Sequence, residues 1–551
     1  MKLRFNRTKT SFPLLCADTK LSRLGLVVFS SFGWVLGAGI VGGNDPLSQL
    51  AACTDRVLSR NPVDLSGVAD YLEVSEFVAR KIVEQAEVDV GIVHIQERDN
   101  GVRVLKKLLK KPEAYVRALV SNYEDSEIGW FSDKWKEKGF FVKDESNFKS
   151  WLGRARGIYP MSEMLCYLLA PVLVVQEMVY GCDILKRWQV KHLSNQDVYQ
   201  KLRVIFDGEH CSTDYSSFEK AQSSSVRTPE LIIVTELLNR AGLPNTAMLY
   251  ARVWSQERRI KTRFFSFAHC ARLSGDYWTS MGNGLTNICL ILTGHWVKVR
   301  HEYDGLESWW RDASQLPFIV EGDDGVMPAA VANPSFIKRM GLSFSMSSSG
   351  AGDGFVDFLR KVWTVDGCVV NVLRAMRSLW LKTSQPLRRG KRMFLLRVAA
   401  LSIHYMQPGH PILSSVVEMV GRLTAGSSGF KNWERWFNNY RVDVSELTPH
   451  KKFPVCESNL GLASFLADGN AVEIPRITLP LQLAVERLIS RFDGRPIEVF
   501  DTFNNYPEYD EMLSYQMLGN DLPRRHLDLA NEGNIGAVAH MLLDPSVSTL
   551  E

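Results

Sequence analysis

The sequence predicts an α+β fold in which helical segments flank a central region of mixed strands and helices. Apolar residues make up 45% and charged residues 23% of the 551 residues, which is ordinary globular usage and excludes disordered and fibrous classes. Apolar residues recur at three- and four-residue spacing between residues 50 and 123, as in amphipathic helices. Residues 204–326 alternate strand-like and helical runs, and the helical pattern returns beyond residue 362. This order indicates one multi-lobed protein rather than independent modules.

The N-terminal region contains an uncharged stretch, residues 24–43, that is long enough to span a bilayer as a helix. Six basic residues and one aspartate precede it, a leader too long for a typical secretory signal. Counting of positive charges places the N-terminus in the cytosol. Two alternatives stay open: the stretch spans the membrane, or its glycines pack it as a helix inside the fold. We expect membrane association through residues 24–43 that leaves the rest of the chain in the cytosol.

Several further elements follow from periodicity and from breaker residues. Residues 74–88 and 102–111 have the spacing of amphipathic helices, residues 123–159 resemble a loop, and residues 161–180 form an apolar helix candidate. The C-terminal helical pattern is interrupted at Pro386, at residues 408–411 and at Gly426.

Charge is distributed unevenly, although the net charge is only +4. Residues 101–160 contain 13 Lys/Arg against 8 Asp/Glu, residues 358–397 contain 10 against 1, and residues 498–551 contain 2 against 10. Such blocks indicate either solvated faces or surfaces for phosphate-rich ligands. The nine cysteines show no C-x-x-C spacing, so we expect reduced thiols in the cytosol and no structural zinc.

The string FIVEGDDGVMP, residues 318–328, predicts a β-hairpin with Asp323 and Asp324 on its turn. Glycine on each side, Gly322 and Gly325, is expected to permit the turn conformation. Adjacent carboxylates repel each other unless a cation neutralises them. An ordinary surface turn is the alternative for this string taken alone.

A further carboxylate precedes the hairpin in CSTDYSSFEKAQ, residues 211–222. We expect Asp214 at the end of a strand that begins near Leu202, with Glu219 five positions further on. A carboxylate at one strand end, facing two on a neighbouring hairpin, suits a pair of divalent cations in phosphoryl transfer.

Polar residues recur in RLSGDYWTSMGNGLTN, residues 272–287. Ser274 and Gly275 predict a turn, and Thr279, Asn283 and Asn287 fall on one face of a following helix. Buried amides and hydroxyls are costly unless they bind something polar. A capped helix with a solvated polar stripe is the alternative.

Cationic residues are spaced through FVKDESNFKSWLGRARGIYP, residues 141–160. They are Lys143, Lys149, Arg154 and Arg156. Guanidinium forks and mobile ammonium groups together suit a triphosphate.

Taken in order, FVKDE…RARGIYP, TDYSSFE, SGDYWTSMGNGLTN and EGDDG resemble motifs F, A, B and C of a viral RNA-dependent RNA polymerase. The closest resemblance is to the nodavirus-like and tombusvirus-like polymerases of positive-strand RNA viruses. The resemblance implies a right-hand polymerase with an antiparallel sheet in its palm. The implied regions are an N-terminal extension (1–90), fingers (91–200), a palm (201–363) with a fingers insertion between motifs A and B, and a helical thumb with an acidic tail (364–551).

The resemblance implies template-directed RNA synthesis from NTPs, for replication and transcription of a viral genome at membrane-associated sites in the host cytoplasm. The implied metal ligands and catalytic residues, which would hold two Mg²⁺ or Mn²⁺ ions, are Asp214, Asp323 and Asp324. The implied nucleotide-binding residues are Lys143, Arg154, Arg156, Glu219, Ser274, Gly275, Thr279 and Asn283. Residues 354–363 resemble motif E, and contact with template and nascent RNA is implied for Arg360, Lys361, Arg374 and Arg377.

The chain departs from the family pattern at two places. Glu219 stands where many relatives have aspartate, and residues 340–350 lack the lysine expected late in motif D. The nearest cations are Lys338, Arg339 and Lys361, so the sequence assigns no proton donor for pyrophosphate.

Two other functions stay open. A reverse transcriptase shares the paired aspartates but lacks the S-G…T…N helix. A catalytically inactive, membrane-bound RNA-binding scaffold would be marked by a lost metal carboxylate, and none is lost here. The chain contains no G-x-x-x-x-G-K-[ST] string, so the sequence does not predict NTPase or helicase activity.

Overall fold

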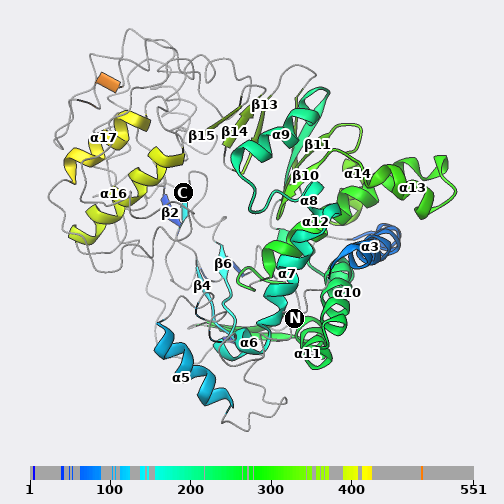
Figure 1. Cartoon of the computed structure of the whole chain (residues 1–551), viewed down its shortest axis with the longest axis horizontal. Helices are drawn as coiled ribbons and strands as arrows, with labels where there is room; N and C mark the ends of the chain where they lie inside the picture. Colours follow the sequence, from blue (N-terminus) through cyan, green and yellow to red (C-terminus); the bar gives the residue numbers. More distant parts are fainter. Residues whose placement is uncertain are drawn as a thin grey trace.

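The protein combines helices with several small sheets, as a computed structural model shows (Figure 1). The structure describes residues 4–5, 39–41, 49, 52–53, 57, 63–87, 102, 106, 112–124, 137–142, 145–147, 156–215, 218–262, 265–269, 272–276, 278–342, 344–349, 355–359, 361–364, 367–370, 389–406, 413–424, 486–487 and 490.

The described elements follow one another with helices predominating before and after a strand-containing centre. In chain order they are β1 (Arg4–Phe5), β2 (Gly39–Val41), α3 (Leu65–Gln85), α5 (Glu113–Glu124), β3 (Glu137–Lys138), β4 (Phe141–Val142), β5 (Glu145–Asn147), β6 (Gly157–Ile158), α6 (Glu163–Leu168), α7 (Pro171–Gly181), α8 (Asp183–Trp188), α9 (Asn195–Phe206), β7 (His210–Tyr215), η4 (Phe218–Ala221), α10 (Ser224–Arg240), α11 (Pro244–Ser255), β8 (Arg258–Lys261), β9 (Phe265–His269), α12 (Thr279–Val299), η5 (Arg300–Glu302), α13 (Leu306–Ala313), β10 (Ile319–Glu321), β11 (Asp324–Pro328), α14 (Pro334–Arg339), β12 (Phe344–Ser349), β13 (Phe355–Phe358), β14 (Lys361–Thr364), β15 (Gly367–Val370), α16 (Arg389–Met406) and α17 (Leu413–Leu423).

The sheet that organises the centre has the strand order β10-β11-β7-β12, with every pair antiparallel. One face packs on α12 and α14, where Val320 and Met327 join the large core that also contains α3 and α10. The other face packs on α9 and on the β13–β14 hairpin, with Ile319 and Val326 buried there. The expectation of an α+β protein is therefore confirmed at this coarse level.

The predicted hairpin at residues 318–328 is confirmed. Glu321 pairs with Asp324, which leaves Gly322 and Asp323 as a two-residue turn. Gly322 has a φ of 63°, a conformation that glycine adopts without strain. Gly325 has a different role from the expected one: it lies in β11, where a Cβ would come within 2.9 Å of Thr213 Oγ1.

The predicted strand start near Leu202 is wrong. Residues 195–206 form α9, and β7 begins only at His210. Ser194 and Asp197 form a reciprocal capping box that starts the helix, and Leu202 is buried while Val204 is 60% exposed, as a helical period requires.

Three other segments differ from the sequence predictions. The helix expected over residues 161–180 is two helices, α6 and α7, because Pro171 begins a new helix at its first position. The loop-like stretch 123–159 contributes short strands β3 to β6. The helical pattern expected beyond residue 362 does not begin there, because β14 and β15 continue to Val370 and the next described element is α16. The breaks predicted at Pro386, at residues 408–411 and at Gly426 lie outside the described residues.

The N-terminal residues contribute two short strands to the described structure. β1 pairs with β9, and β2, which belongs to the stretch 24–43, pairs with β5. The rest of residues 24–43, like most of the predicted helix 102–111, lies outside the described residues. Among the helices that the structure describes, none combines the length and apolarity that a membrane crossing requires.

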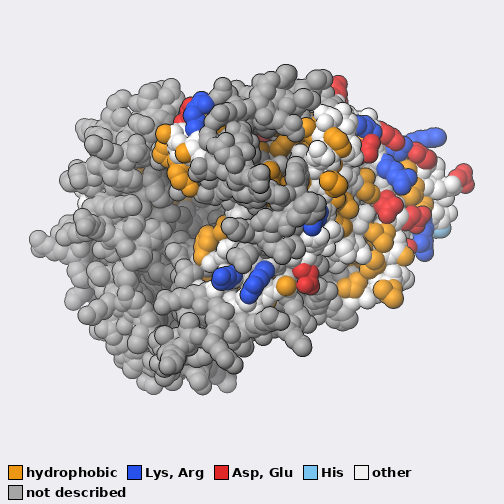
Figure 2. Space-filling view, turned by 90° about the horizontal axis from the view of Figure 1, so that it is seen from below, with side chains coloured by type: hydrophobic (Ala, Val, Ile, Leu, Met, Phe, Trp, Pro, Cys, Tyr) orange, Lys and Arg blue, Asp and Glu red, His pale blue; other side chains and the backbone are white. Residues whose placement is uncertain are grey.

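Charged side chains of both signs are interspersed on the surface near α3 and α13, at the right of Figure 2. Lys81 of α3 pairs with Glu307 of α13 at 2.9 Å, and Arg300 pairs with Asp70 at 3.3 Å. Exposed pairs of this kind contribute little to stability, about 0–1 kcal/mol each. Because charges of both signs alternate here, the surface near α3 and α13 does not present an electrostatic potential of one sign.

We expect His295 to make the protein less stable in acid. Trp309 Nε1 donates to His295 Nδ1 at 3.1 Å, and burial, followed by the charge of Lys298, lowers the pKa of this imidazole from 6.5. The unfolded chain therefore binds the proton at a higher pH than the folded chain, so the stabilisation is complete above about pH 6.5 and is lost as the pH falls through the folded-state pKa.

The measurement is urea unfolding of the wild type and of His295→Gln at about pH 7.5 and about pH 5.5. Glutamine can accept from Trp309 without titrating, so the variant should lose less stability between the two conditions. An equal loss in both proteins would contradict the assignment.

Candidate active site

The register of the central sheet brings the predicted aspartate positions to one end of the sheet. Gly325 of β11 lies opposite Thr213 of β7, and continuing this antiparallel register by one position sets Asp324 beside Asp214. Asp323 occupies the turn immediately before. The backbone of Asp214 is described and its side chain is not. Position 214 and the adjacent pair Asp323–Asp324, which are distant from each other in sequence, thus meet at the end of one strand pair.

Asn287 of α12 holds the turn of the hairpin. Its Nδ2 donates to three consecutive carbonyl oxygens, those of Gly322, Asp323 and Asp324, at 3.2, 3.2 and 3.3 Å. Its Oδ1 accepts from the hydroxyl of Tyr215 at 3.2 Å, which fixes the amide orientation. The sequence placed Asn287 in a polar stripe, and the structure shows that this fully buried side chain stabilises the turn from within.

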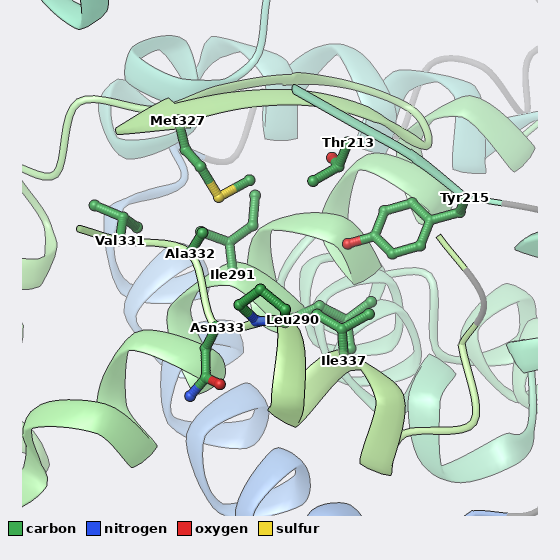
Figure 3. Close-up of a pocket in the computed structure, with 10 residues that line it drawn as sticks. Thr213, Tyr215, Leu290, Ile291, Met327, Val331, Ala332, Asn333 and Ile337 are labelled. Atoms are coloured by element: carbon green, nitrogen blue, oxygen red, sulfur yellow. The ribbon is translucent and has the colours of Figure 1, made fainter. Parts of the chain in front are cut away.

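Tyr215 lies on the helix-facing side of β7, as Figure 3 shows together with Thr213 and Met327. These three side chains line a small cavity closed below by Leu290 and Ile291 of α12. Burial raises the pKa of Tyr215, and the nearby charge of Asp323 raises it further, so the phenol stays protonated and donates to Asn287. Position 214 belongs to the alternate set of strand positions, on the opposite face of the sheet.

A fourth carboxylate, Glu321, lies directly before the turn. Lys191 Nζ lies 3.4 Å from Glu321 Oε1 and also donates to Ser280 Oγ on the first turn of α12. The other oxygen, Glu321 Oε2, is buried and finds no hydrogen-bond partner among the described residues. One buried carboxylate oxygen at this end of the hairpin is therefore not satisfied by a described donor.

The predicted turn at Ser274 and Gly275 is packed against the segment that contains Arg156. Tyr159 N donates to Ser274 O at 2.7 Å, and a Cβ on Gly275 would lie 2.6 Å from Tyr159 O. Gly275 has a φ of 118°, so both its conformation and its surroundings require glycine. Arg156 is exposed three residues before Tyr159. The end of the predicted motif F and the start of motif B are therefore in contact.

Asp276 braces the same turn through a buried ion pair. Arg258 of β8 donates to both carboxylate oxygens of Asp276, at 2.8 and 3.0 Å. Thr279 Oγ1 donates to the carbonyl oxygens of Leu273 and Asp276, the former at 3.0 Å. Thr279, a predicted nucleotide contact, is the first residue of α12. Its hydroxyl proton points into the preceding turn and not toward solvent.

Arg272 joins this region to α10 and to η4. Its guanidinium donates to Asn283 Oδ1 at 3.1 Å, to Gln222 Oε1 at 2.6 Å and to Thr286 Oγ1 at 3.1 Å, and pairs with Glu230. Arg272 is 1% exposed. Burial lowers the pKa of this guanidinium to about 9, which leaves it charged at neutral pH. Glu219 lies half-buried on η4, and its carbonyl oxygen accepts from Gln222 N at 3.3 Å.

Several predicted site residues lie outside the described residues. They are Lys143, Lys149, Arg154, Arg360, Arg374 and Arg377. Lys361 is described on β14, where its ammonium contacts Asn195 Oδ1 and lies 5.6 Å from the centre of the Trp363 ring. Burial lowers the pKa of Lys361. Predicted contacts with RNA are therefore untested at three positions, and at the fourth the side chain makes contacts within the fold.

The cations near the predicted motif D also differ in their surroundings. Arg339 Nε and Nη2 pair with Asp64 and Asp70 of the α3 region at 3.0 and 3.3 Å, and Lys338 is exposed on α14. The contacts of Arg339 stabilise the junction of α14 with α3. Among the described side chains, to which that of Asp214 does not belong, no group of three or more His, Cys, Asp or Glu is arranged to hold a metal ion.

No protein-family model matches the chain, and no curated protein matches its sequence. The polymerase family inferred from the motifs therefore stays a prediction.

Sequence reasoning missed four buried residues that support the site: Arg272, Glu230, Arg258 and Asp276. Two of them flank the predicted turn, in the string RLSGD. A charge on each side of a Ser-Gly turn was a signal for ion pairing. The partners, Glu230 and Arg258, lie 42 and 18 positions away from them and cannot be identified from spacing alone.

We expect Asn287→Leu to lower the free energy of unfolding by roughly 2–3 kcal/mol, because three carbonyl oxygens of the turn lose their donor. Tyr215→Phe is the matched comparison, since it removes only the hydroxyl that donates to Asn287 and should cost about 1 kcal/mol. Urea unfolding followed by tryptophan fluorescence measures both. Equal costs in the two variants would show that Asn287 does not stabilise the turn.

Proposed function

We propose that this protein is an RNA-directed RNA polymerase that copies an RNA template from nucleoside triphosphates, with a right-hand arrangement of fingers, palm and thumb. The observation that supports the proposal most strongly is the register of the β7–β11 pair, because it sets position 214 beside the Asp323–Asp324 turn. The motif order predicts this juxtaposition, and a chance match between short strings would have no reason to produce it.

The chemistry of the donor set fits the cofactor that this function requires. Three aspartates would supply oxygen ligands of the kind that Mg²⁺ or Mn²⁺ prefers, and the buried Glu321 Oε2, which has no described donor, lies directly before the same turn. Bound Mg²⁺ supplies acidification of the primer hydroxyl and stabilisation of the triphosphate oxygens. In this proposal Asp214, Asp323 and Asp324 hold the ions, and Asn287 keeps the turn rigid before any ion binds.

The remaining elements have separate roles in the proposal. Arg156, with Lys143 and Arg154, binds the triphosphate through charge-assisted hydrogen bonds. Thr279 and Asn283 of α12 contact the ribose. The Ser274–Gly275 turn contacts Tyr159 and so holds the segment that contains Arg156 next to the start of α12. Template and nascent RNA are the partners, and the function would be exercised in the host cytoplasm at membrane-associated replication sites.

Two other functions, reverse transcription and RNA binding without catalysis, predict different results in a primer-extension assay. A reverse transcriptase would incorporate dNTPs at least as well as NTPs, whereas an inactive scaffold would bind RNA without extending a primer. Primer extension by the full chain on homopolymeric RNA, with Mg²⁺ and with NTPs and dNTPs offered separately, distinguishes all three. Extension with NTPs alone is the expected result.

We expect Asp323→Asn to reduce nucleotide addition by at least about 10²–10³-fold, because an electrostatic contribution to the transition state is lost. The folded structure should persist, since the turn is held through backbone oxygens. Asp183→Asn is the matched control: Asp183 is an exposed aspartate of α8 paired with Lys186. Extension by the Asp323 variant within tenfold of wild type would contradict the metal assignment.

A further inference from the structure

The fold determines which atoms of two neighbouring side chains on α12, Thr279 and Asn283, remain to donate or accept a hydrogen bond. Asn283 lies one turn after Thr279, so the two side chains share a face of the helix. Arginine has donors only, so the contact of Arg272 Nε with Asn283 at 3.1 Å requires the amide oxygen to face the guanidinium. The amide NH₂ of Asn283 is thereby the group directed away from Arg272.

Thr279, in contrast to Asn283, is left with a hydrogen-bond acceptor. Its hydroxyl donates to the carbonyl oxygens of Leu273 and Asp276, which occupies the hydroxyl proton. The oxygen of Thr279 keeps lone pairs and offers an acceptor. Both residues are only partly buried, so a ligand can reach them. The first turn of α12 therefore presents an acceptor and a donor one helical turn apart.

We propose that Arg272 is a positioning residue for ribose selection: it orients Asn283 as a donor, so that Asn283 and Thr279 together bind one ribose hydroxyl, which accepts from the first and donates to the second. This inference rests on the proposed polymerase function and adds to it the residue that sets the sugar preference. A 2′-hydroxyl is both donor and acceptor, and a deoxyribose lacks it.

The surroundings of Arg272 fit a positioning role rather than a surface contact. Its charge is balanced by buried Glu230, whose other oxygen accepts from Tyr250 Oη at 2.6 Å. A Cβ on Gly282 would lie 2.3 Å from both Arg272 Nη1 and Glu230 Oε2, so α12 approaches this pair as closely as glycine allows. The guanidinium is held from several sides and cannot follow Asn283 if that side chain moves.

The same guanidinium reaches the segment of Glu219. Arg272 Nη2 donates to Gln222 Oε1, and Gln222 Nε2 donates in turn to Phe218 O at 3.3 Å, at the start of η4. Arg272 therefore links α12 to the short helix on which Glu219 lies. Glu219 stands where the resemblance implies the shorter aspartate. Through this link, the backbone that carries Glu219 is held in position relative to Asn283.

The test measures single-nucleotide incorporation by the full chain on an RNA primer-template, with CTP and with 2′-deoxy-CTP. Arg272→Lys keeps a charge for Glu230 but removes the Nε donor. We expect the ratio of the two kcat/KM values, CTP over 2′-deoxy-CTP, to fall about tenfold, with the loss confined to CTP. A purely structural role would lower both kcat/KM values together and leave the ratio unchanged, which would overturn the inference.

Asn283→Asp covers the case in which Arg272→Lys does not fold. A carboxylate still accepts from Arg272 but offers no donor to the ribose, so this variant should fold and show a similar fall in the ratio. Arg397→Lys is the control: Arg397 is a buried arginine that donates to Gly421 O between α16 and α17, and its ratio should equal that of wild type. An unchanged ratio in Asn283→Asp overturns the inference alone, whereas a wild type that extends with neither nucleotide overturns it together with the proposed function.

Discussion

The amide of Asn287 is the contact on which the candidate site depends. It connects α12 to the hairpin turn through three backbone oxygens and receives a hydrogen bond from Tyr215 of β7. One side chain thus fixes a helix and two strands relative to one another. These contacts use the backbone of Asp323 and Asp324 and not their carboxylates, so they position the two side chains without bonding to them.

The sequence predicted those parts of the structure that are decided locally. The hairpin follows from apolar runs on either side of a Gly-Asp turn, and the polar face of α12 follows from helical spacing. The prediction of a strand start near Leu202 was wrong because a short apolar run fits both the two-residue period of a strand and the 3.6-residue period of a helix. The capping box formed by Ser194 and Asp197 favours the helix. The boundaries of the proposed lobes stay predictions.

The arrangement within the site was less accessible to sequence reasoning. Spacing placed Asn283 and Asn287 on one face, but it gave no information on which end of each amide faces the protein. That polarity comes from partners far away in the chain, Arg272 for one amide and Tyr215 for the other. Long-range donor–acceptor matching depends on the folded geometry, so a local pattern can name the residues without giving their orientation.

The glycines of α12 have a consequence for how the protein folds. Gly282 and Gly284 admit Arg272, Glu230 and Gln189 at distances that any Cβ would violate. Each glycine weakens the intrinsic helix by about 1 kcal/mol relative to alanine, so α12 gains its order from neighbours rather than from its own sequence. A separate peptide with the α12 sequence should therefore be less helical than the same segment is in the folded protein. The first turns of α12, which carry the candidate site, thus depend for their order on the packing of Arg272, Glu230 and Gln189 against these glycines.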